Sequence, residues 1–149
     1  MTMLSQSRGG MPAPPARVID ARSPLSGCHV LVLDDEPLIA MDVACMLEDA
    51  GASVTEAGNA RSAMAVADRS KRGERLACAV LDVNLGNHTC RDVAERLRTL
   101  GVPFVLHTGN LRGPTGLADR IGAPVVSKPA TREALIDALR GAMDGRARH

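Results

Sequence analysis

Hydrophobic residues occur along the chain in five short runs at regular spacing. The runs are Val30–Leu33, Ser53–Glu56, Ala77–Leu81, Phe104–Leu106 and Pro124–Val126. Runs that are apolar at nearly every position are typical of strands buried on both faces of a parallel sheet. The pattern therefore predicts the strands of such a sheet.

The stretches between these runs carry apolar residues at helical spacing. In the first stretch, Pro37 suits a first turn and Gly51 a C-terminal cap, whereas Asn59 and Thr131 are typical N-caps of later helices. The fourth connection, Asn110–Gly122, is rich in glycine, so its helix is expected to be short or loose. Strands alternating with helices predict an open α/β fold, a doubly wound parallel sheet with helices on both faces.

The length of 149 residues fits one domain. Residues 1–27 are rich in Pro, Gly, Ser and Arg and show no apolar periodicity, which predicts a flexible N-terminal arm. The folded domain is expected over residues 28–143 and a short C-terminal tail over residues 144–149. No second domain is expected after it.

Charge and composition exclude several classes of function. The 18 basic and 17 acidic residues nearly cancel, and a single Phe without Tyr or Trp gives no base-stacking surface, so no nucleic-acid partner is expected. No apolar run approaches membrane-spanning length, and the N-terminus lacks the order of a signal peptide. The cysteines occur singly, without a CxxC pair, which favours reduced thiols and a cytoplasmic location.

Polar residues that suit phosphoryl chemistry follow the predicted strands. The first strand ends in Asp34-Asp35-Glu36, the third in Asp82, the fourth in Thr108 and the fifth in Lys128. Because ligand sites of open α/β sheets form beyond the carboxyl ends of the strands, these side chains are expected to converge. His107, beside Thr108, is expected to fill space.

Clustered carboxylates repel one another unless they bind a cation or take up a proton, and hard oxygen ligands suit Mg²⁺. A carboxylate can also attack a phosphoryl group and form an aspartyl phosphate. Asp82 is the best candidate nucleophile, and Asp34 and Asp35 are better as metal ligands, directly or through water. Thr108 and Lys128 would each hold a phosphoryl oxygen.

Four segments, VLVLDDEPL, CAVLDVNLG, VLHTGN and VVSKPA, resemble in order the acidic pair, phosphoacceptor, threonine and lysine-proline motifs of response-regulator receiver domains. The resemblance covers Cys28 to about Met143. It implies a flavodoxin-like five-stranded parallel sheet of order 2-1-3-4-5. It also implies a signalling protein of a two-component phosphorelay that is not an enzyme.

The resemblance further implies roles for single residues. Asp82 would accept a phosphoryl group from a histidine kinase or a histidine phosphotransfer protein. Asp35, Asp82 and the backbone carbonyl of Asn84 would bind Mg²⁺, with Asp34 helping through water. Lys128 and Pro129 would be joined by a cis peptide bond.

The chain also departs from the family pattern. Gly86 stands where a proline is common, and Val125 stands where an aromatic residue usually couples to the threonine. VPFVLHTGN is similar to the FAT-GUY group of stand-alone receivers. Switching is therefore expected to rely on ordering of the segment Gly109–Gly122 around the phosphoryl group.

Other functions remain open at this stage. An aspartyl-phosphate phosphatase of the haloacid-dehalogenase class would need an acid two residues beyond Asp82, where this chain has Asn84. A receiver-like interaction module that is never phosphorylated is a second alternative, and a DNA-binding regulator is a third. Without an output domain, the protein would signal by contact with a target protein or would drain phosphoryl groups from a shared kinase.

Overall fold

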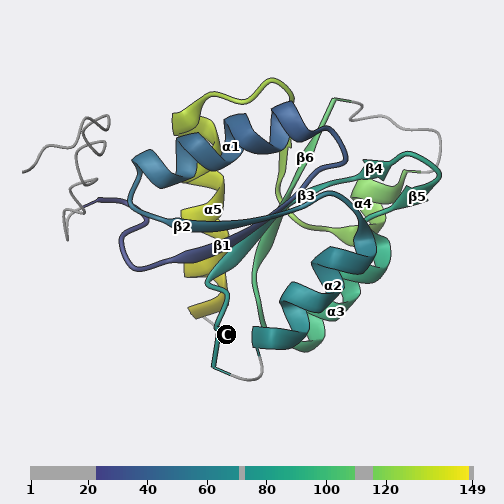
Figure 1. Cartoon of the computed structure of the whole chain (residues 1–149), viewed down its shortest axis with the longest axis horizontal. Helices are drawn as coiled ribbons and strands as arrows, with labels where there is room; N and C mark the ends of the chain where they lie inside the picture. The colour runs from purple at the N-terminus through teal and green to yellow at the C-terminus, as the bar shows by residue number, and fades with distance from the viewer. Residues whose placement is uncertain (1–22, 71–72, 110–115, 148–149) are drawn as a thin grey trace, which may run out of the picture.

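A parallel sheet runs through the centre of the computed structural model, which describes residues 23–70, 73–109 and 116–147 (Figure 1). Its strands are β1 (His29–Leu33), β2 (Ser53–Ala57), β3 (Cys78–Asp82), β6 (Phe104–Thr108) and β7 (Val125–Ser127). The helices are α1 (Pro37–Asp49), α2 (Ala60–Arg69), α3 (Arg91–Thr99), α4 (Leu117–Ile121) and α5 (Arg132–Ala147). A small antiparallel hairpin, β4 (Asn84–Leu85) and β5 (His88–Thr89), lies outside the sheet.

The five strands of the sheet have the order β2-β1-β3-β6-β7, and every pair is parallel. When the hairpin is left out of the count, this is the order 2-1-3-4-5, so the predicted fold class is confirmed. The first strand of the chain therefore lies in the interior of the sheet, and its carboxyl end is next to that of β3.

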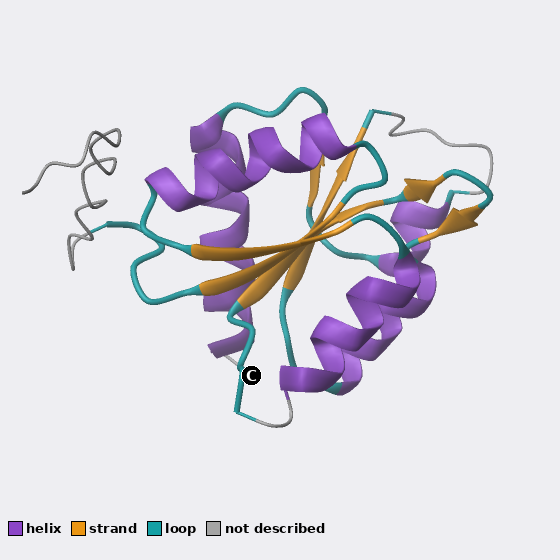
Figure 2. Cartoon of the chain, in the orientation of Figure 1, coloured by secondary structure: helices purple, strands orange, loops and turns teal. Residues whose placement is uncertain are grey.

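Alternating residues of the three interior strands, β1, β3 and β6, pack into two separate cores. Val30 and Val32 of β1 face the core formed with α1 and α5, whereas Leu31 and Leu33 face the core formed with α2, α3 and α4. Figure 2 shows the resulting three layers, with helices on both sides of the sheet. Strands that are buried on both faces explain why the sequence runs are apolar at successive positions.

Three helices begin at the residues that the sequence predicts. Pro37 occupies the first turn of α1. The Asn59 side chain accepts a hydrogen bond of 2.8 Å from the backbone N–H of Ser62, and Thr131 Oγ1 accepts one of 3.1 Å from Ala134. These bonds satisfy amide groups that have no partner within the helix.

The N-terminal boundary of the fold differs from the prediction. Residues 23–27, assigned from the sequence to the flexible arm, fold onto the end of α1: the Leu25 side chain is fully buried, and its N–H donates to Ala50 O over 2.9 Å. Gly51 permits this contact, because a Cβ at this residue would lie 2.9 Å from Ser23 Cβ. One buried leucine in a segment rich in Pro, Ser and Gly produces no periodicity, so the pattern could not indicate it. Residues 1–22 of the predicted arm lie outside the described residues.

The C-terminal boundary also differs. Helix α5 has 16 residues and continues through residues 144–147 of the predicted tail. Among the helices of the described residues, none combines the length and the hydropathy that crossing a bilayer requires.

The cysteines of the described residues are free thiols. Burial raises the pKa of Cys78 to about 12 and that of Cys90 to about 12, with smaller contributions from Cys28 and Asp82 respectively. A thiol with so high a pKa carries almost no thiolate at neutral pH, so these two side chains are core residues of low reactivity.

We expect the substitution Leu25→Ala to lower the free energy of unfolding by about 2–4 kcal/mol, because it leaves a cavity under residues 23–27. Urea unfolding followed by circular dichroism would measure this. Leu38→Ala is the matched control, since Leu38 is 75% exposed on α1 and its loss should change stability by less than about 0.5 kcal/mol. Equal effects of the two substitutions would show that residues 23–27 do not belong to the folded unit.

Candidate acidic site at the sheet edge

Four polar residues meet where the parallel strands end. Asp34 directly follows β1, Asp82 is the last residue of β3, Thr108 is the last residue of β6 and Lys128 directly follows β7. Asp82 pairs in register with His107, and Thr108 pairs with Ser127. The register of the sheet therefore brings these residues, distant in sequence, to one edge.

The Lys128 ammonium bridges two buried carboxylates. Its Nζ lies 2.9 Å from Asp34 Oδ2 and 3.3 Å from Asp82 Oδ2. The three side chains are 15%, 3% and 7% exposed in the order Lys128, Asp34, Asp82. Two carboxylates in such a place repel each other by several kcal/mol at an effective dielectric of about 20, and a shared cation offsets that repulsion.

The titration of the site reflects this arrangement. Burial raises the pKa of Asp82 to about 6; the nearby Lys128 charge lowers the pKa, and the Asp34 charge raises it. Burial lowers the pKa of Lys128, but the hydrogen bond with Asp34 and the charge of Asp82 outweigh this and raise the pKa above its usual value. At neutral pH Lys128 is therefore fully charged. Next to it lies an Asp82 carboxyl that takes up a proton more easily than an ordinary aspartate.

The run Asp34-Asp35-Glu36 forms a cluster of oxygen ligands. One carboxylate oxygen from each residue lies within 4.8 Å of the others. Asp34 Oδ1 accepts a hydrogen bond of 2.9 Å from the Glu36 N–H while Oδ2 contacts Lys128, so both of its oxygens are engaged. Asp35 and Glu36 are exposed. The sequence interpretation gave no role to Glu36, although the third consecutive carboxylate was a visible signal.

The β4–β5 hairpin places a second segment beside the carboxylates. The Asn84 N–H donates to Asp82 Oδ1 over 3.3 Å. Gly86, in the turn of the hairpin, has a φ of +69°, and a Cβ at this position would lie 3.9 Å from Asp35 Oδ2. The hairpin was not predicted, although the Gly86-Asn87 pair between its strands is a typical two-residue turn.

Thr108 and Lys128 are held together by the sheet. Thr108 is 1% exposed, and its carbonyl oxygen accepts a hydrogen bond of 3.0 Å from the Lys128 N–H. The Lys128-Pro129 peptide bond is cis, as the resemblance implied. Val125, at the position where receivers carry an aromatic ring, is 40% exposed on β7. Residues 110–115 of the predicted switching segment lie outside the described residues.

Comparison with known proteins decides the family. The family model described as "Response regulator receiver domain" matches residues 30–140. The chain belongs to the response-regulator receiver family. A Mycobacterium tuberculosis protein named "Probable transcriptional regulatory protein TcrX" is 36% identical over 119 residues, which cover 74% of this chain and 47% of the relative. The chain therefore spans about half the length of this curated relative.

Solved receiver structures show the same fold. A CheY-like receiver domain protein from Methanospirillum hungatei is 21% identical with a TM-score of 0.68, over 81% of this chain and 97% of that one. A receiver protein from Sinorhizobium medicae is 25% identical with a TM-score of 0.66, over 80% and 96%. Receiver domains act in two-component signal transduction and bind Mg²⁺ at an acidic pocket, and the edge described above has that acidic character.

The substitution Lys128→Met should lower the free energy of unfolding by about 2–4 kcal/mol at pH 8, because Asp34 and Asp82 lose their shared cation. The loss should be smaller at pH 5, where Asp82 takes up a proton. Thermal unfolding at the two pH values would measure it. Arg91→Met, which removes an exposed ion pair with Glu95, is the control and should cost less than about 0.5 kcal/mol. A loss that does not depend on pH would contradict this electrostatic explanation.

The raised pKa of Asp82 also predicts how stability depends on pH without divalent metal. Because the pKa is about 6 in the fold against 3.8 for a free side chain, the fold favours the protonated carboxyl. Its contribution is complete below pH 3.8 and is lost as the pH rises through 6. Asp82→Asn avoids that loss, so at pH 8 in EDTA the variant should be more stable than the wild type by about 1–3 kcal/mol.

The same comparison at lower pH provides the internal control. The advantage of Asp82→Asn should shrink as the pH falls from 8 to 5, when the wild-type carboxyl becomes neutral. Urea titrations across this range would measure the difference. A variant less stable than the wild type at pH 8 would show that the attraction of Lys128 for ionised Asp82 exceeds the cost of burial.

Proposed function

We propose that this receiver domain accepts a phosphoryl group on Asp82 from a histidine kinase or a histidine phosphotransfer protein. The observation that carries the proposal is the bridge from Lys128 Nζ to Asp34 and Asp82, at 2.9 and 3.3 Å. It is supported by the burial of Asp82 beside Thr108 at the strand ends, where a small anion would be shielded from water.

The transfer exchanges one phosphorus bond for another. An Asp82 carboxylate oxygen attacks the phosphorus atom of a phosphohistidine, the new P–O bond forms, and the P–N bond breaks with its electron pair returning to the donor imidazole. Lys128 compensates the negative charge that the phosphoryl oxygens bring. Thr108 would donate its hydroxyl hydrogen to a further phosphoryl oxygen.

The carboxylates also fit a magnesium ion. Asp34, Asp35 and Glu36 offer hard oxygen ligands within 4.8 Å of one another, which suits this cation and its bound waters. We assign Asp35, Asp82 and the Asn84 carbonyl as ligands, with Asp34 acting through water. Both Asp34 oxygens are held by the protein at 2.9 Å, whereas the two Asp82 oxygens make longer contacts of 3.3 Å. When bound, the ion would offset the charge repulsion between carboxylates and phosphoryl oxygens.

Output by protein–protein contact is part of the same proposal. The match to the receiver model covers residues 30–140. A stand-alone cytoplasmic receiver of the FAT-GUY group would signal through a target protein or drain phosphoryl groups from a shared kinase. The similarity to a relative named as a transcriptional regulator supports an alternative, in which the output of the receiver acts through a DNA-binding segment.

The test is intact mass spectrometry after incubation with acetyl phosphate, with and without Mg²⁺. We expect the wild type to gain one phosphoryl group only in the presence of the metal, and Asp82→Asn to gain none. Asp137→Asn, which removes an exposed carboxylate on α5, is the matched control and should react like the wild type.

Two results would contradict the proposal. A phosphoryl adduct on Asp82→Asn would place the acceptor elsewhere. Absence of an adduct on the wild type, with added phosphorylated donor protein and quenched time points to exclude fast hydrolysis, would favour a receiver that acts without phosphorylation.

A further inference from the structure

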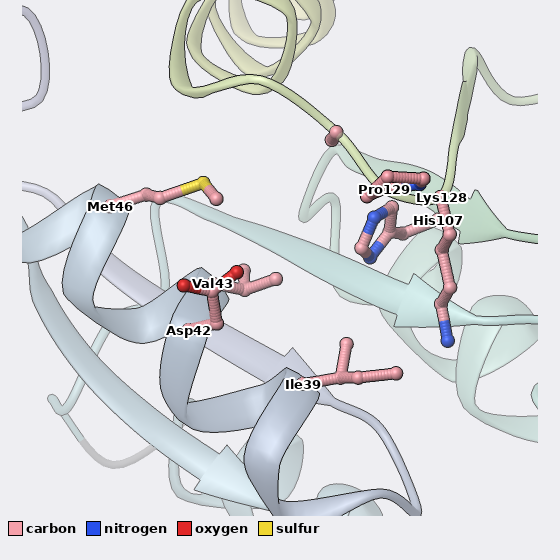
Figure 3. A pocket seen from close by; sticks show the side chains of 8 residues that line it. Ile39, Asp42, Val43, Met46, His107, Lys128 and Pro129 are labelled. Carbon is pink, nitrogen blue, oxygen red and sulfur yellow. The ribbon is translucent and has the colours of Figure 1, made fainter.

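A cavity of about 280 Å³ lies between α1 and the segment that joins β7 to α5 (Figure 3). Helix α1 contributes Ile39, Val43 and Met46 to its lining, and the joining segment contributes Pro129 and Ala130. These side chains are apolar, and the volume is close to the lower end of the range for small-molecule pockets, about 300–1,000 Å³. The size suits a molecule no larger than a single substituted ring.

A buried histidine of the lining has a ring nitrogen that forms no hydrogen bond within the described part of the chain. His107 is 3% exposed, and its Nε2 is buried without a hydrogen-bond partner among the described residues. Figure 3 shows its ring beneath Pro129, between that residue and the side chains of α1. Because a buried polar atom without a partner costs free energy, a ligand whose polar group hydrogen-bonds this nitrogen would remove that cost.

The state of the imidazole limits the polar group it can receive. Burial, and after it the charge of Lys128, lower the pKa of His107, while the charge of Asp34 raises it; the net direction favours the neutral ring. In a neutral imidazole, Nε2 either donates or accepts a hydrogen bond, depending on the tautomer. A hydroxyl group can both donate and accept, so it suits Nε2 in either case.

The surrounding charges disfavour an anion. Asp42, which is exposed, lies at the pocket lining. The Lys128 ammonium is already bonded to Asp34 and Asp82. No cation of the described lining is therefore left to pair with a ligand anion.

We propose that this pocket binds a small uncharged molecule with an apolar body and one hydroxyl group, which hydrogen-bonds His107 Nε2 while the body packs between α1 and Pro129. The site is separate from the acidic cluster, although Lys128 lines both, and the proposal does not depend on phosphorylation of Asp82.

The test uses 4-fluorophenol as the probe and fluorobenzene, which lacks only the hydroxyl, as the matched ligand. Each is titrated into the full chain, with binding followed by ¹⁹F NMR and by backbone amide shifts. We expect saturable binding of 4-fluorophenol, with shifts in α1 and in the segment from β7 to α5. Fluorobenzene should bind about fivefold to tenfold more weakly, the factor expected for one hydrogen bond.

Three variants locate the binding. His107→Leu removes the nitrogen and should abolish the preference for 4-fluorophenol, and Met46→Phe fills the cavity from α1 and should weaken both ligands. His29→Leu is the matched control, because His29 lies on β1 and bonds Thr55 Oγ1 over 2.7 Å, away from the pocket lining. Circular dichroism checks that each variant is folded.

The proposal is overturned by absence of saturable binding to the wild type, by equal affinity for the two ligands, or by binding that neither His107→Leu nor Met46→Phe changes. If His107→Leu does not fold, Met46→Phe and the pair of ligands on the wild type still decide the question.

Discussion

Two carboxylates buried at one edge of the sheet require a cation beside them, and Lys128 is that cation. Asp34 and Asp82 are nearly inaccessible to solvent, and a single Nζ lies within 3.3 Å of an oxygen of each. Without the ammonium, one of the two carboxyl groups would have to take up a proton or move into solvent. The acidic residues at the ends of β1 and β3 thus depend on Lys128, which follows the last strand of the sheet, β7.

This dependence explains why the register of the sheet matters for the site. Thr108 pairs with Ser127, and its carbonyl accepts the Lys128 N–H, so β7 presents the lysine directly beside the end of β6. A shift of one residue would turn Lys128 toward the opposite face. The apolar cores on the two faces of the sheet set the register, and the charged edge is built on that register.

Helix α1 and the segment after Lys128 serve two neighbouring features. At the strand ends, Asp34 lies just before α1, and Lys128 neutralises its negative charge. Beside this charged edge, the cavity that His107 lines is enclosed by Ile39, Val43 and Met46 of α1 and by Pro129. The two features differ in chemistry because one faces the acidic strand ends and the other lies among apolar side chains.

Local sequence patterns were sufficient to predict the alternating strands and helices. Apolar runs and capping residues predicted the five-stranded parallel sheet, and the position of Asp82, Thr108 and Lys128 at strand ends predicted that they would meet, because parallel strands end at one edge. The burial of Leu25, the position of the hairpin at Asn84 over the carboxylates and the unpartnered nitrogen of His107 were decided only by the tertiary structure. Each depends on which distant side chains surround a residue, and neither periodicity nor spacing along the chain contains that information.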